Sequence, residues 1–101
     1  MPENRFSWDA RKNRTNIEKH GISFPKAAKI FDAARVEKED VRRDYGEKRT
    51  VALGRSEGRI LRVVYTRRNS VIRIISARKA KRDERAEYIR RVHPITTGHN
   101  T

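Results

Sequence analysis

The segment from Ser76 to Arg82 holds four cationic side chains in seven residues, at Arg78, Lys79, Lys81 and Arg82. A predicted strand ends and a predicted helix begins within this segment, so unpaired backbone N–H groups and the positive end of a helix dipole lie beside these cations. Lysine and arginine are electrostatically unfavourable in the first turn of a helix, which argues against a merely solvated helix start. The segment therefore favours a binding site for an anion such as phosphate.

One side of the predicted final helix combines cations with an aromatic ring, because Lys81, Arg85 and Tyr88 follow one another at i, i+4 and i+7. An aromatic ring can stack on a nucleic-acid base while neighbouring cations hold the phosphates. Packing in the protein core is the alternative for Tyr88 and is the more frequent role of a single aromatic side chain. This helix side is a candidate nucleic-acid contact in which the role of Tyr88 stays open.

His20 is the side chain best suited to transfer a proton, because imidazole gains and loses a proton near neutral pH. Cleavage of an RNA phosphodiester needs such a group, since the 2′-hydroxyl must lose a proton and the leaving oxygen must gain one. The alternative is that His20, beside Lys19 in the last turn of a helix, only complements the helix dipole. The two other histidines, His93 and His99, lie in the C-terminal tail, and the sequence predicts no metal site.

Arg73 lies within an apolar predicted strand and therefore needs a partner for its charge. Strict alternation groups one face as Val71, Arg73, Ile75 and Ala77, and the opposite face as Ile72, Ile74 and Ser76. One explanation of the arginine is an ion pair within the fold to Asp32 or Glu84. The other is an anion site on the sheet surface, and the sequence leaves both open.

Two short helices are predicted near the N-terminus. The first spans residues 10–20, between the N-cap Asp9 and the left-handed end at Gly21. Its regularly spaced side is Ala10, Asn13, Ile17 and His20. The second follows the N-cap Ser23, and its apolar positions are Phe24, Ala27, Ala28 and Phe31. Phe6 and Trp8 are expected to close one end of the core.

The middle of the chain has a hydrophobic period of two, which predicts strands. Residues 50–55, 59–66 and 71–77 are rich in β-branched and aromatic residues and are joined by hairpin-length connections, which predicts an antiparallel meander. Residues 34–37 are a candidate fourth strand.

The C-terminal part returns to helix-forming residues over 79–91, where Ala86 and Ile89 are the apolar positions. The predicted fold class is therefore α+β, with two N-terminal helices, a three- to four-stranded antiparallel sheet and one C-terminal helix. Residues 1–91 are expected to form a single domain, and residues 92–101 a flexible tail.

The composition indicates a polyanionic partner. The chain carries 26 Lys and Arg against 13 Asp and Glu, a net charge of +13, and most of the cations are arginines, whose planar fork suits phosphate. The absence of cysteine excludes disulfides, thiolate zinc sites and cysteine nucleophiles. No apolar stretch is long enough for a membrane span or a signal peptide, so the sequence predicts a cytoplasmic protein without membrane contact.

Two groups of residues resemble the BrnT family of toxins. The N-terminal group comprises Phe6, Trp8, Asp9, residues 16–24 (NIEKHGISF), Ala27, Ala28, Phe31 and Asp32. The C-terminal group comprises residues 49–55, 61–66 and 72–80 together with Tyr88. The resemblance covers nearly the whole predicted domain, and it is specific because the KHG-x-x-F and RIIS-AR segments occur together at a suitable separation.

The resemblance implies a RelE-like ribonuclease fold and the toxin component of a type II toxin-antitoxin system. Such a toxin is an endoribonuclease that cleaves RNA, free or on the ribosome, and inhibits translation without a metal or other cofactor. The resemblance also implies a BrnA-like antitoxin with a ribbon-helix-helix DNA-binding domain. Operator DNA would then be contacted only through the antitoxin.

The matched motif positions imply a catalytic set of His20, Lys19, Arg73 and Arg78, to which we add Tyr88 from the final helix. By this resemblance the two arginines bind the scissile phosphate and its developing charge, His20 transfers a proton, and Lys19 supports it electrostatically. Six further cations are expected to bind RNA: Arg55, Arg62, Lys79, Lys81, Arg82 and Arg85.

Two other classes of function need the same charge. A noncatalytic RNA- or DNA-binding module would bind RNA and leave it intact, with an affinity that falls steeply with salt. An interaction subunit whose basic face binds an acidic polypeptide would not bind RNA at physiological salt. Binding and cleavage of RNA therefore separate the three alternatives.

Overall fold

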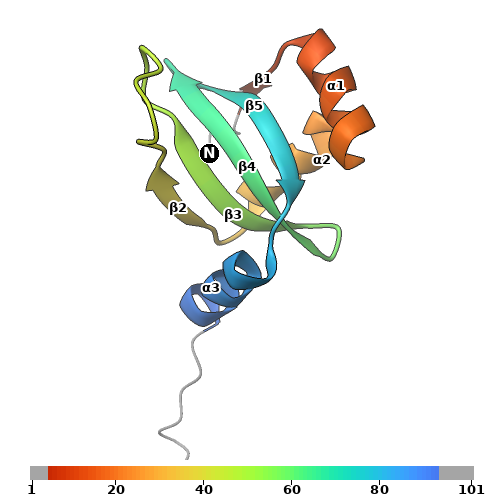
Figure 1. Ribbon diagram of the computed structural model, residues 1–101, viewed down its shortest axis with the longest axis vertical. Coiled ribbons are helices and arrows are strands. Elements are labelled where there is room, and N and C mark those ends of the chain that lie inside the picture. Colours follow the sequence, from red (N-terminus) through yellow and green to blue (C-terminus); the bar gives the residue numbers. More distant parts are fainter. Residues whose placement is uncertain (1–4, 94–101) are drawn as a thin grey trace, which may run out of the picture.

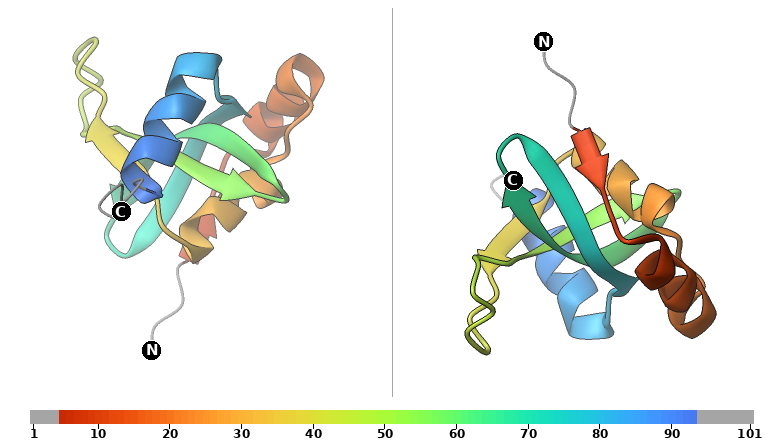
Figure 2. Two further views of the ribbon diagram at one scale, coloured as in Figure 1. Left: turned by 90° about the horizontal axis from the view of Figure 1, so that it is seen from below. Right: turned by 90° about the horizontal axis from the view of Figure 1, so that it is seen from above.

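The computed structural model describes residues 5–93, which form a five-stranded sheet with helices on both faces (Figure 1). The elements are β1 Arg5–Ser7, α1 Ala10–His20, α2 Phe24–Ala28, the 3-10 helix η1 Lys29–Asp32, β2 Val36–Glu39, β3 Thr50–Ser56, β4 Arg59–Arg68, β5 Val71–Lys79 and α3 Arg82–Val92. α2 and η1 cover one face of the sheet, α3 covers the other, and α1 lies along the edge of β5 (Figure 2).

The sheet is mixed, with strand order β1-β5-β4-β3-β2, and it corrects the predicted three- to four-stranded antiparallel sheet. β2 to β5 are antiparallel, as predicted, but β1 pairs with β5 in parallel, with Phe6 opposite Ile72. A strand of three residues is too short to show a period of two. Its parallel partner also lies more than sixty residues away, so the sequence pattern predicts neither the strand nor its direction. The α+β class itself is correct.

The first predicted helix is present as α1, but its buried side differs from the prediction. Asp9 is the N-cap, Gly21 ends the helix with φ +71°, and the bounds agree with residues 10–20. Ile17, however, is 43% exposed, and His20 is exposed, whereas Asn16 is buried. Because α1 is attached to the fold through amide side chains, apolar periodicity did not identify its packed side.

Two apolar clusters lie on opposite faces of the sheet. The first packs α2 and η1 on the sheet through Ile22, Phe24, Ala27, Ile30, Phe31, Ala52, Leu61, Val63, Tyr65, Ile72, Ile74 and Ala77, with Phe6, Trp8 and Ala28 at its border. The second lies beneath α3 and comprises Val36, Leu53, Ile60, Ala80 and Tyr88, with Val92 partly buried. The expectation that Phe6 and Trp8 close one end of the core is confirmed.

The final helix begins at Arg82, later than predicted, because β5 continues to Lys79 and pairs there with Leu61. Its buried residue is Tyr88, whereas Ala86 and Ile89 are exposed, so the predicted apolar side was wrong. Of the predicted tail at residues 92–101, the part from residue 94 onward lies outside the described residues.

A β-bulge in β5 changes which side chains share a face. Val64 pairs with Ser76 and Tyr65 pairs with Ile74, which leaves Ile75 without an opposite residue. After such a bulge the alternation of side chains shifts by one position. Ala77 therefore joins the core face of Ile74, and the predicted grouping of Ala77 with Arg73 was wrong.

Gly54 allows η1 to approach β3 closely. A Cβ atom at this position would lie 2.7 Å from Ile30 Cβ and 3.3 Å from Ile30 Cγ2. We expect Gly54→Ala to lower the free energy of unfolding by about 1–3 kcal/mol, because the added methyl group overpacks a buried contact. Urea denaturation of the variant and the wild type measures this loss. A loss below about 0.5 kcal/mol would mean that η1 moves away at little cost.

Candidate active site

One buried asparagine attaches α1 to the edge of β5. Asn16 Nδ2 donates to the carbonyl oxygens of Ile22 (2.7 Å) and Ala77 (2.8 Å), and the N–H of Ala77 donates to Asn16 Oδ1 (3.2 Å). β1 pairs only with the first residues of β5, so the amide satisfies the backbone of Ala77 as a neighbouring strand would. The last turn of α1 is thereby fixed against β5.

Lys19 and His20 lie in a surface groove of about 380 Å³ between α1 and β5, called here the α1/β5 groove. On the β5 side it is lined by Ile75 and Ser76. From the N-terminal part of the chain it is lined by Asp9, Arg11, Lys12, Thr15, Asn16, Lys19 and His20. The groove therefore brings the KHG motif beside the RIIS-AR motif, and it combines three full positive charges with an imidazole and two hydroxyl groups.

Asp9 is the one carboxylate among the residues that line the α1/β5 groove. Its Oδ1 accepts the backbone N–H of Lys12 (3.0 Å) and of Arg11 (2.8 Å) as the N-cap of α1. These hydrogen bonds, that of Lys12 above all, hold the pKa of the carboxyl below its usual value. Asp9 thus stays an anion that caps α1, and because three cations outnumber it the groove has a net positive charge that suits a phosphate.

The bulge at Ile75 places Arg73 and Arg78 on the same sheet face as Ser76. Arg73 lies opposite Thr66, is half-buried, and its Nη1 donates to Ser7 Oγ over 3.4 Å. Within residues 5–93 it forms no ion pair, so the structure does not show the alternative in which Arg73 pairs with Asp32 or Glu84. Neither arginine lines the α1/β5 groove, although Ser76 lies between them on β5.

Arg78 is paired with Glu84 of α3 through two hydrogen bonds, Nη1 to Oε1 at 2.9 Å and Nη2 to Oε2 at 3.0 Å. Arg62, directly opposite Arg78 on β4, approaches the same carboxylate at 3.6 Å. The two guanidinium groups thus share one carboxylate, and their side chains are only 26% and 15% exposed. Burial and then the charge of Arg78 lower the pKa of Arg62, whereas the hydrogen bond from Arg78 lowers the pKa of Glu84.

Glu84 also occupies the predicted anion site at the start of the final helix. The backbone N–H of Lys81, the N-cap of α3, donates to Glu84 Oε1 over 2.7 Å. A glutamate three residues after the N-cap commonly satisfies a free N–H group in this way. The anion that the segment from Ser76 to Arg82 attracts in this structure is therefore a carboxylate of the chain itself. Lys81 and Arg82 remain exposed beside it.

Tyr88 packs in the apolar cluster beneath α3 and is only 2% exposed. One face of its ring lies near Arg55, whose guanidinium carbon is 5.9 Å from the ring centroid. Burial leaves no ring face open to a stacked base, which supports the core-packing alternative for this residue. Lys81 and Arg85, the other residues of its predicted helix side, are exposed.

Three of the cations predicted to bind RNA gather in a second hollow, of about 310 Å³, between the β3–β4 turn and α3. These are Arg55, Lys79 and Arg85, and the sequence analysis missed a fourth, Arg59. The available signal for Arg59 was its position directly after the predicted hairpin turn. Asn16 was missed as well, because it carries neither charge nor apolar surface.

Residues 5–93 are the part of the chain that the structure describes. No group of three His, Asp or Glu side chains in it could hold a metal ion. None of its helices combines the length and the apolar character of a membrane span.

Comparison with known proteins identifies the family of this chain. The family model described as "Ribonuclease toxin, BrnT, of type II toxin-antitoxin system" matches residues 8–84, well over half of the chain. The chain belongs to the BrnT toxin family. This confirms the family predicted from the KHG-x-x-F and RIIS-AR segments, and both segments lie within the match. The BrnT family is one of ribonuclease toxins, so RNA is its substrate class and an antitoxin its partner.

A solved BrnT structure has a similar fold. The crystal structure of the Brucella abortus ribonuclease toxin BrnT, at 1.1 Å resolution, superposes with a TM-score of 0.60 at 28% sequence identity. The match covers 79% of this BrnT-family chain and 100% of the Brucella chain. No curated protein sequence matches the chain.

Proposed function

We propose that this BrnT-family toxin cleaves RNA in the α1/β5 groove. The observation that carries the proposal is the position of Lys19 and His20 beside Ser76 in one groove whose single lining carboxylate is engaged in capping a helix. A polyanion is attracted to such a groove, and an imidazole is present where a proton must move.

In the proposed reaction the 2′-oxygen of the RNA attacks the adjacent phosphorus, and the bond from phosphorus to the 5′-oxygen breaks. The 2′-hydroxyl loses a proton and the 5′-oxygen gains one; His20 transfers the proton at one of these two oxygens, and water exchanges the proton at the other. Lys19 stabilises the negative charge that develops on the phosphate. The products are a 2′,3′-cyclic phosphate and a free 5′-hydroxyl, so protons and bonds balance without a metal ion or other cofactor.

Arg73 and Arg78 are proposed to bind the scissile phosphate from the sheet face that carries Ser76. Ser76 is three residues from Arg73 and two from Arg78, which is roughly 7–10 Å along a strand and within reach of an arginine side chain. A phosphate offers Arg78 the same pair of oxygen acceptors that it takes from Glu84, so one anion can replace the other. Tyr88 is proposed to hold α3 in place through its packing.

The biological role that we propose is inhibition of translation in the cytoplasm through cleavage of RNA. A BrnA-like antitoxin would neutralise the toxin and would carry the ribbon-helix-helix domain that binds operator DNA. The net charge of +13 supports an anionic antitoxin surface, because such a surface would both cover and neutralise the RNA-binding cations.

The test is incubation of the purified chain with synthetic single-stranded RNA in the presence of EDTA. We expect cleavage with a 2′,3′-cyclic phosphate end, and no cleavage of the same strand carrying a 2′-deoxy sugar at the cut. RNA that is bound but left intact would support the noncatalytic module instead. In cells, expression without the antitoxin should arrest growth, and the Arg78→Ala variant should not. If the wild type and the Arg78→Ala variant arrest growth equally, Arg78 is not part of the proposed site.

A further inference from the structure

The hollow between the β3–β4 turn and α3 is lined by four cationic side chains from four different elements. Arg55 comes from β3, Arg59 from β4, Lys79 from β5 and Arg85 from α3. The remaining lining residues are Gly58, Ile60 and Ala80, so no carboxylate lines the hollow. Cations from separate elements repel one another when the fold brings them together, and an anion bound between them would relieve that repulsion.

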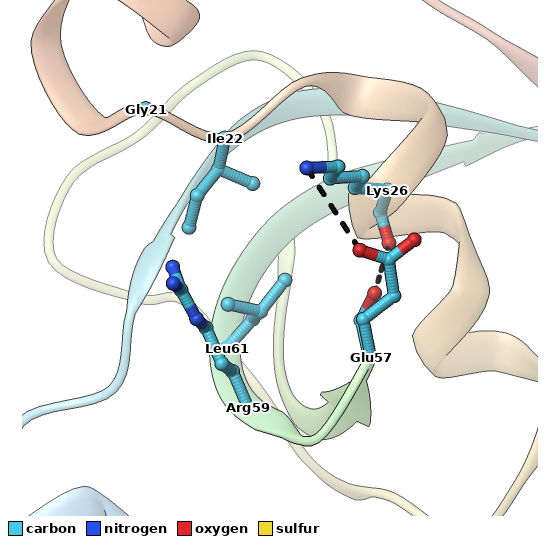
Figure 3. A pocket seen from close by; sticks show the side chains of 7 residues that line it. Gly21, Ile22, Lys26, Glu57, Arg59 and Leu61 are labelled. Atoms are coloured by element: carbon cyan, nitrogen blue, oxygen red, sulfur yellow. Dashed lines mark hydrogen bonds and ion pairs between the residues drawn. The ribbon is translucent and has the colours of Figure 1, made fainter.

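Two carboxylates close in sequence to these cations, Glu57 and Glu84, are engaged elsewhere. Glu57, in the turn beside Gly58, turns away to α2 and η1, where it pairs with Lys26 (3.8 Å) and Lys29 (2.8 Å); Figure 3 shows Glu57 beside Lys26. Glu84, one residue before Arg85, pairs with Arg78. Within residues 5–93 none of the four cations of the hollow forms an ion pair.

Two of the arginines make contacts within the protein that hold their guanidinium groups in position. Arg85 Nη1 donates to the carbonyl oxygen of Ala80 over 2.9 Å, and the guanidinium of Arg55 lies over the ring of Tyr88. Each contact uses only part of the five-donor guanidinium and leaves other donors for a ligand. Fixed donors lose less side-chain entropy on binding, so the hollow is preorganised for an anion.

Arg59 connects this hollow to a third one, whose lining begins at the residue after His20 of the α1/β5 groove. Its side chain lines this third hollow, of about 270 Å³, together with Gly21, Ile22, Lys26, Ser56, Glu57 and Leu61. Figure 3 shows the side chain of Arg59 extending from the β4 end of the turn toward Ile22. Gly21 directly follows His20 in the chain. The three hollows therefore follow one another from His20 past Arg59 to Arg85.

We propose that the Arg55/Arg59/Lys79/Arg85 hollow binds backbone phosphates of the same RNA strand that is cut in the α1/β5 groove, and that Arg59 bridges the two sites. This inference rests on the proposed function. Three of the four cations are arginines, whose planar fork matches a phosphate. The one large apolar residue among the lining, Ile60, is buried, so the hollow offers no apolar anchor for a peptide. An RNA strand is thus the favoured ligand over an acidic polypeptide.

The test compares the Arg59→Gln/Arg85→Gln double variant with a control variant, Arg14→Gln/Arg90→Gln, which removes two exposed cations that do not line these hollows. Binding is measured with a 2′-O-methyl RNA about ten nucleotides long, which cannot be cut and which spans a typical single-strand site. On a plot of log affinity against log salt concentration, we expect the slope of the double variant to be shallower than that of the wild type by about 1.4, which is about 0.7 for each lost phosphate contact. The slope of the control variant should stay close to that of the wild type.

Cleavage kinetics separate this inference from the proposed function. On a long RNA the double variant should raise KM and leave kcat unchanged, and on a dinucleotide that fills only the α1/β5 groove it should match the wild type. If the wild type cleaves RNA but the double variant has an unchanged salt dependence and KM, the inference is overturned. If the wild type cleaves no RNA at all, the proposed function fails instead. If polyglutamate competes with the labelled RNA as effectively as unlabelled RNA does, the inference that RNA is the ligand of this hollow is overturned.

Discussion

Replacement of His20 by alanine is expected to slow RNA cleavage by a factor of about 100 to 10,000, the usual contribution of a positioned acid or base. His20 is the histidine of the α1/β5 groove, which Lys19, Thr15 and Ser76 also line. Without the imidazole, the 2′-hydroxyl and the leaving oxygen exchange protons only with water. Single-turnover cleavage of a labelled RNA by purified protein measures the chemical step directly.

The matched control for His20→Ala is His93→Ala, which removes an exposed histidine just after α3, away from the groove. We expect the control to keep wild-type activity. His20 also lies in the last turn of α1, where a protonated histidine can stabilise the helix dipole by about 0.3–1 kcal/mol. Urea denaturation separates that loss of stability from the loss of rate. If His20→Ala stays within about twofold of the wild type, the proposed role of His20 is wrong.

The second large effect is expected on stability, from Asn16→Ala. This change leaves three buried backbone groups without partners, namely the carbonyl oxygens of Ile22 and Ala77 and the N–H of Ala77. An unsatisfied buried polar group costs about 1–3 kcal/mol, so we expect the free energy of unfolding to fall by about 3 kcal/mol or more. A loss of about 3 kcal/mol should lower the Tm by roughly 12–24 °C in a domain of this length.

Asn13→Ala is the matched control for Asn16→Ala. Asn13 lies one turn earlier on α1, and its Oδ1 accepts a single hydrogen bond, from the N–H of Phe24 at 2.8 Å. Loss of one such capping bond costs about 1 kcal/mol. Thermal and urea unfolding of both variants give the comparison. If Asn16→Ala is no more destabilising than Asn13→Ala, then α1 does not depend on the amide bridge to Ala77.

Local signals in the sequence predicted several elements well. Asp9, Gly21 and Ser23 are capping residues whose chemistry acts within a few positions. α1 begins and ends, and α2 begins, where these residues predict, whereas α2 ends at Ala28 and the chain continues as the 3-10 helix η1, which contains Phe31. The three long strands were predicted because each is long enough to show its alternation, and each is joined to the next by a short turn. The net charge, the family motifs and the α+β class likewise depend only on which residues are present and how they are spaced.

The faces of the elements could not be predicted in the same way. Periodicity assumes that apolar side chains do the packing and that alternation is unbroken. Asn16 packs α1 through hydrogen bonds instead, and the bulge at Ile75 shifts the alternation so that Ala77 changes face. In α3, Tyr88 is buried, whereas the exposed Ile89 was predicted to be buried.

The sequence by itself determined the family, the α+β class, the positive charge and the motif positions of Lys19, His20 and Arg78. Only the tertiary structure decided where those charges lie relative to one another. It joined the end of α1 to β5 in one groove, paired Arg78 with Glu84, and gathered Arg59 with cations from three other elements. The physical reason is that these contacts join residues far apart in the chain, and their geometry depends on strand pairing and a bulge that no local pattern records.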